Sequence, residues 1–212
     1  MARFLNKSAY TDKPHYTGPM SIRRLLGVVL ICLPIPGLAQ SPETEVRVFL
    51  QTRDRDIKQA VARLEGGTQK ERDRAASLIN DQIDFAEMGR LALGDYWSDL
   101  TDAQRADFVA TFGAIVRGQS LSDLTVYNAV VTIDSIGVSG AKAYVRTRAD
   151  VEGTALKVEY LLRRKEEAWW LYDIILDDVG TVEGYAISFQ TYIRKRGFER
   201  FMASLKKKLP PG

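Results

Sequence analysis

Few side chains in this chain of 212 residues have the chemistry of an active site. The chain holds one histidine, His15, and one cysteine, Cys32. Imidazole and thiol groups supply most general bases, nucleophiles and zinc, copper or iron ligands. Two adjacent acids, Asp177 and Asp178, have the types of a paired-carboxylate site, but the sequence offers them no partner base. Stabilisation of a following helix N-terminus is the interpretation we favour for this pair.

The first 39 residues have the pattern of an export signal. Arg23 and Arg24 are basic, residues 25–35 form an apolar run, and Gly37 and Ala39 place small side chains at the −3 and −1 positions of a cleavage point. We expect cleavage after Ala39 and a periplasmic mature chain of residues 40–212 that forms a single domain, with Met20 as an alternative start of translation. A single membrane anchor is the alternative, although the apolar run is short for a bilayer.

Cleavage at this point would remove both His15 and Cys32. The mature chain would then have no imidazole base, no thiol nucleophile and no disulfide, and a Ser-His-Asp triad would be impossible. Its composition, 45% hydrophobic and 27% charged, is that of an ordinary globular domain. Removing the basic N-terminal segment also changes the net charge from +3 to −1. We therefore predict no catalytic residue, no metal or other cofactor, and no nucleic-acid partner.

Helical patterns dominate the first part of the mature chain. Residues 41–64 and 68–81 are predicted helices, and the stretch 83–112 joins two more through a sharp break. Gly94 is expected to end the first helix of that pair, and Thr101 with Gln104 has the spacing of a capping box. The second of these helices is expected to end near Leu124.

From residue 125 the period changes to that of strands. Residues 126–136, 141–150, 154–164 and 169–176 alternate and are joined by short turns, which predicts an antiparallel meander of four strands or slightly more. A terminal helix, interrupted at Gly197, follows. The predicted fold class is therefore α+β, with N-terminal helices, an antiparallel sheet and a C-terminal helix.

The second predicted strand has an inward face of small side chains. These are Ala143, Val145, Thr147 and Ala149. Because protein interiors are close-packed, small residues facing helices are either compensated by large aromatic partners or leave room for an apolar ligand. The pattern alone favours compensation but leaves both interpretations open.

The order of several motifs resembles the MlaC-type periplasmic phospholipid carriers, also called the toluene-tolerance family. The motifs in the helical part read Asp84-Phe85, Met88, Leu93-Gly94, Trp97, Leu100-Thr101, Gln104-Arg105 and Phe108. Those in the later part read Trp169-x-x-Tyr172-Asp173, Val179, Tyr185, Phe189 and Gly197. The resemblance covers most of residues 41–208.

Three departures mark the chain as a divergent member. It has Asp178-Val179-Gly180 where the family usually has Gly-Val-Ser, Ala186 where an Arg usually follows the Tyr, and Ser120 where a Tyr is expected.

The resemblance implies a non-enzymatic carrier with a cavity like that of nuclear transport factor 2. Such carriers shuttle phospholipid between an outer-membrane lipoprotein complex and an inner-membrane ABC transporter, with transient proximity to membranes. Bound phospholipid is then the cargo, and the acyl chains have to be enclosed by large apolar side chains. The residues predicted to do so are Phe85, Trp97, Phe108, Phe112, Val145, Val158, Tyr160, Tyr185 and Phe189.

Three alternatives remain open at this point. The cargo could be another amphiphile, such as a hopanoid or a solvent. The same scaffold could instead be a small-substrate enzyme, with Asp173 or Tyr160 as its acid–base residue. An adaptor whose interior is filled by aromatic side chains is the third possibility.

Overall fold

Six α-helices and a five-stranded sheet are present in the part of the chain that the structure describes, residues 40–64, 66–121, 124–151 and 153–210. The structure is a computed structural model. These residues belong to one unit of contacts, Ala39–Gly212, and the predicted export signal lies outside the described residues. Among the described helices, none is long and apolar enough to cross a membrane.

Helices occupy the two ends of the described chain. The α-helices are α1 (Pro42–Val61), α2 (Gln69–Asn80), α3 (Phe85–Leu93), α4 (Asp102–Gln119), α5 (Thr181–Arg196) and α6 (Phe198–Lys206). Short 3₁₀ helices are η1 (Gly94–Trp97) and η2 (Thr125–Asn128). The strands are β1 (Val130–Ser139), β2 (Lys142–Val151), β3 (Thr154–Lys165), β4 (Ala168–Leu176) and β5 (Val179–Gly180).

The sheet has the order β1-β2-β3-β4-β5, and every neighbouring pair is antiparallel. This confirms the predicted α+β class and the meander. The predicted start of the first strand at Val126 is wrong, because η2 occupies residues 125–128. There the N–H of Tyr127 donates to the carbonyl of Leu124 at 3.2 Å, and its hydroxyl donates to the carbonyl of Ser120 at 2.7 Å. These bonds hold a helical turn, so β1 begins only at Val130.

Local capping sets the helix ends. At the start of α4, the N–H of Gln104 donates to Thr101 Oγ1 at 3.2 Å, and Gln104 Oε1 accepts the N–H of Thr101 at 2.9 Å. This is the predicted capping box. Gly94 (φ +57°) ends α3, and Gly197 (φ +79°) separates α5 from α6. The first and fourth helices end at Val61 and Gln119, slightly before the expected ends.

The acids at 177 and 178 lie in the β4–β5 turn and not at a helix start, so the predicted interpretation is wrong. Both have positive φ angles, and both accept hydrogen bonds from Lys157. The backbone N–H of Lys157 donates to Asp177 Oδ1 at 3.0 Å, and Lys157 Nζ donates to Asp178 Oδ1 at 3.1 Å. The acid that stabilises the N-terminus of α5 is instead Asp173 on β4, because its Oδ1 accepts the N–H of Val182 in the first turn of α5 at 3.0 Å. The physical reason is β5, which separates the two acids from the helix.

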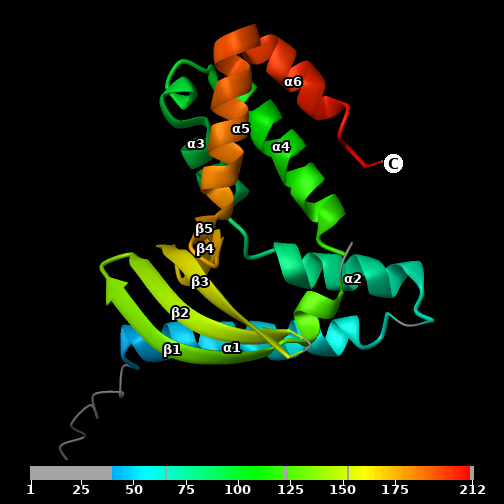
Figure 1. The fold of residues 1–212 in the computed structure, drawn as a ribbon, viewed down its shortest axis with the longest axis vertical. Coiled ribbons are helices and arrows are strands. Elements are labelled where there is room, and N and C mark those ends of the chain that lie inside the picture. The colour runs from blue at the N-terminus through cyan, green and yellow to red at the C-terminus, as the bar shows by residue number, and fades with distance from the viewer. Residues whose placement is uncertain (1–39, 65, 122–123, 152, 211–212) are drawn as a thin grey trace, which may run out of the picture. The chain divides into compact units, whose positions relative to one another are not determined.

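Two large cores are built from different elements. One is an aromatic core of α3, α4, α5 and α6, and Figure 1 shows these helices gathered together. The other lies between α1 and the sheet, where Val46 contacts a group that includes Val145 and Trp169. Figure 1 also shows α1 running along the sheet.

Candidate functional site

A cavity of about 870 Å³ lies between the sheet and α1. Residues from the C-terminal ends of α2 and α4 and from η2 complete the lining. Protein interiors rarely contain voids larger than a water molecule, and a volume of this size is within the range of small-molecule sites. The cavity is therefore the leading candidate for a binding site.

Small side chains of β2 create part of this space. Thr147 and Ala149 are both buried and line the cavity, together with Val158 of the neighbouring strand. The hydroxyl of Thr147 donates to the carbonyl of Val158 at 2.7 Å, so its polar group is satisfied within the sheet. The sheet thus presents a largely apolar wall.

The other small residues of the same strand have a different environment. Ala143 and Val145 are buried against Val46 of α1 and Trp169 of β4. Both interpretations of the inward face of β2 therefore apply, each to one half of the strand. Large partners fill the space at residues 143 and 145, and open space remains at residues 147 and 149.

The wall opposite the sheet comes mainly from α1. Its lining residues include the apolar Leu50 and Ile57 and the interleaved polar Arg47, Gln51 and Asp54. All five follow the three- and four-residue spacing of one helical face. Hydrophobic periodicity found the apolar members of this stripe, but polar residues on the same face carry no such signal.

Sequence reasoning also missed the end of the cavity. Ile79 and Asn80 from the end of α2 line it, as do Ser120 and Tyr127. Asn80 is buried, and its side-chain amide donates to Ser120 Oγ at 2.8 Å. Ser120 is one of the positions where the chain departs from the pattern of the MlaC-type carriers, so this departure falls within the cavity wall.

Within the described part of the chain, the lining has three charged side chains, Arg47, Arg53 and Asp54, and the last two form hydrogen bonds with other residues of the protein. Asp54 accepts from Lys58 at 2.8 Å, and Arg53 donates to the carbonyl of Leu78. Burial, reinforced by the negative charge of Asp54, raises the pKa of Tyr160, so this phenol is neutral near pH 7. The interior of the cavity is thus mostly apolar, with its ionised groups on the α1 side.

The two candidate acid–base residues occupy different places. Tyr160 lines the cavity, whereas Asp173 does not. Asp173 Oδ1 instead accepts backbone N–H groups of Ile174 and Val182 at 2.9 and 3.0 Å, and burial raises the pKa of its carboxyl group. Within the described residues, no group of three acidic, His or Cys side chains is placed to hold a metal ion.

Two of the nine predicted lipid-binding residues line the cavity, namely Val158 and Tyr160. Val145 lies in the core under α1. The other six belong to the aromatic core or pack against it, outside the cavity lining, and they are Phe85, Trp97, Phe108, Phe112, Tyr185 and Phe189.

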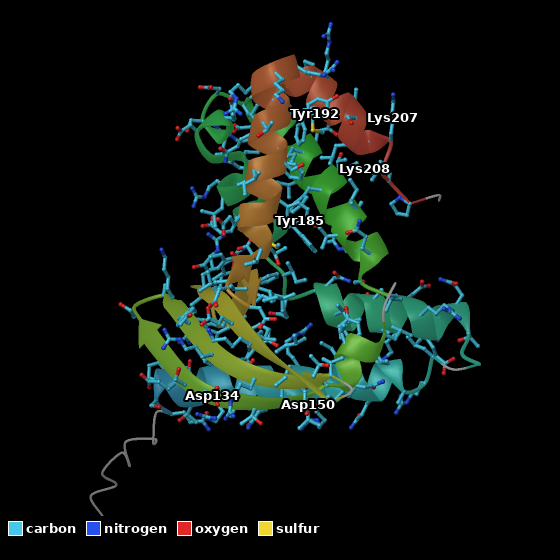
Figure 2. All side chains as sticks on the ribbon, in the orientation of Figure 1. Asp134, Asp150, Tyr185, Tyr192, Lys207 and Lys208 are labelled. Carbon is cyan, nitrogen blue, oxygen red and sulfur yellow. The ribbon has the colours of Figure 1, made fainter. Side chains whose placement is uncertain are left out.

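The six aromatic residues contact one another closely. Phe108 stacks on Phe112 with ring centroids 5.7 Å apart, and Phe112 meets Tyr185 edge to face at 5.0 Å. Figure 2 shows Tyr185 on α5, among the helices. Contact of these residues with lipid stays a prediction.

The fold and the cavity together define an α+β domain with a large, mostly apolar cavity. A family model described as MlaC protein matches residues 51–207, and the chain belongs to this family. Among solved structures, the chain is similar to the phospholipid-binding protein from Ralstonia solanacearum, which was solved in complex with a phospholipid. The two chains are 20% identical, and the match covers 78% of this chain and 95% of the Ralstonia solanacearum chain with a TM-score of 0.63. The similarity is therefore one of fold. No curated protein matches the chain.

Proposed function

We propose that the protein is a periplasmic phospholipid carrier that holds the acyl chains of its cargo in the cavity. In this role it passes lipid between an outer-membrane lipoprotein complex and an inner-membrane ABC transporter. The observation that carries the proposal is a cavity of about 870 Å³ with an apolar sheet wall, in a member of the MlaC family. Val158 and Tyr160, with Ala149 beside them, are the proposed tail contacts.

The size of the cavity supports a two-chain cargo. At about 30 Å³ per non-hydrogen atom, the share of a water molecule in the liquid, the cavity holds about 29 atoms. Two acyl chains of about 16 carbons have a similar number of atoms, so the tails alone fill this space. A headgroup then has to remain at the rim or outside.

The energetics of transfer agree with an apolar enclosure. Each buried methylene group is worth about 0.8 kcal/mol, so two such chains represent about 25 kcal/mol. A carrier has to offset nearly all of this loss for lipid to leave a membrane, and this requires burial, not bond chemistry. A nearly balanced transfer has no direction of its own, so the partner complexes would supply it.

Native mass spectrometry of residues 40–212 exported to a bacterial periplasm tests the proposal. We expect an adduct of phospholipid mass that is lost when the protein is denatured, and solvent extraction of the same sample identifies the lipid. A refolded, delipidated sample serves as the control for the apo mass. An apo mass alone in repeated gentle preparations would overturn the carrier proposal, and a hopanoid or other amphiphile in the extract would change the cargo.

A further inference from the structure

We propose that Arg47, together with Gln51 one turn further along α1, binds the phosphate group of the cargo at the rim of the cavity. The protein would therefore select phospholipids with a net negative headgroup over zwitterionic ones. This inference rests on the proposed function, because it concerns the headgroup of the lipid whose tails occupy the cavity.

Exposure identifies Arg47 as the charged group at the rim. The lining residues that are exposed to solvent are Arg47, Gln51, Gln119, Val126, Thr132 and Leu176. Arg47 is the charged member of this set. Since the tails fill the interior, the headgroup has to meet exposed lining residues, and Arg47 offers it a positive charge.

Arg47 also has no structural task in the described part of the chain. No hydrogen bond or ion pair joins it to another described residue, including Glu43 one turn earlier on the same helix. The other lining cation, Arg53, is half-buried and donates to a backbone carbonyl. The guanidinium of Arg47 therefore keeps its five donors, whose fork geometry matches the oxygens of a phosphate.

Gln51 adds a neutral donor on the same face. Residues four apart on a helix lie side by side, so its amide reaches the same region as the guanidinium. The acid on this face, Asp54, is paired with Lys58 at 2.8 Å. The carboxylate of Asp54 is 42% exposed, but Lys58 already balances its charge, so Arg47 is the lining charge left for a headgroup among the described residues, which favours glycerol over ethanolamine.

Lipid exchange with vesicles of known composition tests this selectivity. Delipidated protein is incubated with vesicles that contain equal amounts of phosphatidylglycerol and phosphatidylethanolamine, and the bound lipids are counted by native mass spectrometry. The variants are Arg47→Gln and Arg47→Glu. Arg55→Gln is the matched control, because Arg55 is an exposed arginine of the same helix that pairs with Asp56 and lies outside the cavity lining.

We expect the unmodified protein to enrich phosphatidylglycerol and Arg47→Gln to reduce this enrichment by about two- to fivefold, as for loss of a solvent-exposed ion pair. Arg47→Glu should remove or invert the preference, and added salt should weaken it. Arg55→Gln should behave like the unmodified protein. Equal lipid ratios in all four proteins would overturn the inference and leave the carrier function standing.

The outcomes separate this inference from the function beneath it. Absence of any bound lipid would instead count against the carrier proposal itself. In the last experiment, inorganic phosphate is titrated into the delipidated protein, and the shift of the Arg47 Nε–H signal in NMR spectra reports binding. Saturation at millimolar phosphate with no change of lipid ratio in Arg47→Gln would assign a free-phosphate site and reject the headgroup role.

Discussion

Nε of Arg163 on β3 lies 2.6 Å from Oδ2 of Asp84, the residue that caps α3. Lys165 approaches the same carboxylate oxygen at 3.3 Å, while the other oxygen accepts the N–H of Glu87 at 3.1 Å. Only 2% of Asp84 is exposed. Although burial opposes its charge, these hydrogen bonds and the charges of Arg163 and Lys165 outweigh it and hold the pKa of the carboxyl group below its usual range. One carboxylate thus ties the helical core to the sheet.

Asp84→Asn tests this junction. The amide keeps an acceptor for the helix cap but loses the attraction to both cations, so we expect a loss of about 2–3 kcal/mol in the free energy of unfolding. Urea denaturation followed by circular dichroism measures it. The control is Asp102→Asn, whose fully exposed side chain pairs with Arg105 at 3.2 Å and should have no measurable effect. Equal effects of the two substitutions would contradict the assigned role of Asp84.

The stability contribution of Asp173 should depend on pH with a sign opposite to that of Asp84, because the pKa of Asp173 is raised and that of Asp84 is lowered. Burial raises the pKa of the Asp173 carboxyl group, so the folded protein binds the proton more strongly than the unfolded chain. The contribution of this group to stability therefore falls as pH rises from the ordinary aspartate pKa through the raised value. Asp173→Asn keeps an acceptor for the N–H of Val182 and removes this charge.

The variant should thus be more stable than the unmodified protein at pH 7 and should lose that advantage at pH 3. Asp173→Ala, which removes the acceptor, should be about 1 kcal/mol less stable than Asp173→Asn at both values. The measurement is the urea midpoint across the pH range, with exposed Asp95→Asn as the control. A constant difference between Asp173→Asn and the unmodified protein would show that burial does not penalise the ionised form.

Ala149→Phe should block the cavity without breaking the fold. The side chain of Ala149 lines the cavity, and the added ring of six carbons takes about 180 Å³ at the volume per atom used above. We expect a severalfold fall in the lipid-bound fraction seen by native mass spectrometry, with an unchanged circular dichroism spectrum. Val130→Phe is the control, since Val130 is on the same sheet but 70% exposed and outside the lining. Full lipid loading of Ala149→Phe would place the cargo elsewhere.

Phe112→Leu separates the aromatic core from the cavity. Phe112 is buried among Phe85, Phe108, Tyr185 and Phe189 and does not line the cavity. We expect a loss of about 1–3 kcal/mol in stability, because the smaller side chain leaves space and removes ring contacts. Lipid bound per folded molecule should not change. If the variant kept its stability but lost lipid, the aromatic core would be a lipid site, as the sequence predicted.

Local signals in the sequence were sufficient to locate several helix ends and the inward face of one strand. The capping box of Thr101 and Gln104 and the glycines at 94 and 197 act over a few residues, and they end or begin helices where predicted. Alternation in β2 likewise identified its inward face. These features depend on backbone geometry and near neighbours, which a linear sequence contains.

The sequence by itself therefore determined the α+β class, the antiparallel meander and the inward face of β2. Only the tertiary structure decided which buried residues share a core and which face the cavity. Phe108 and Val158 are both buried, yet one packs among helices and the other lines the cavity. The physical reason is that periodicity reports an inward direction, whereas the partner met there is set by contacts between segments far apart in the chain.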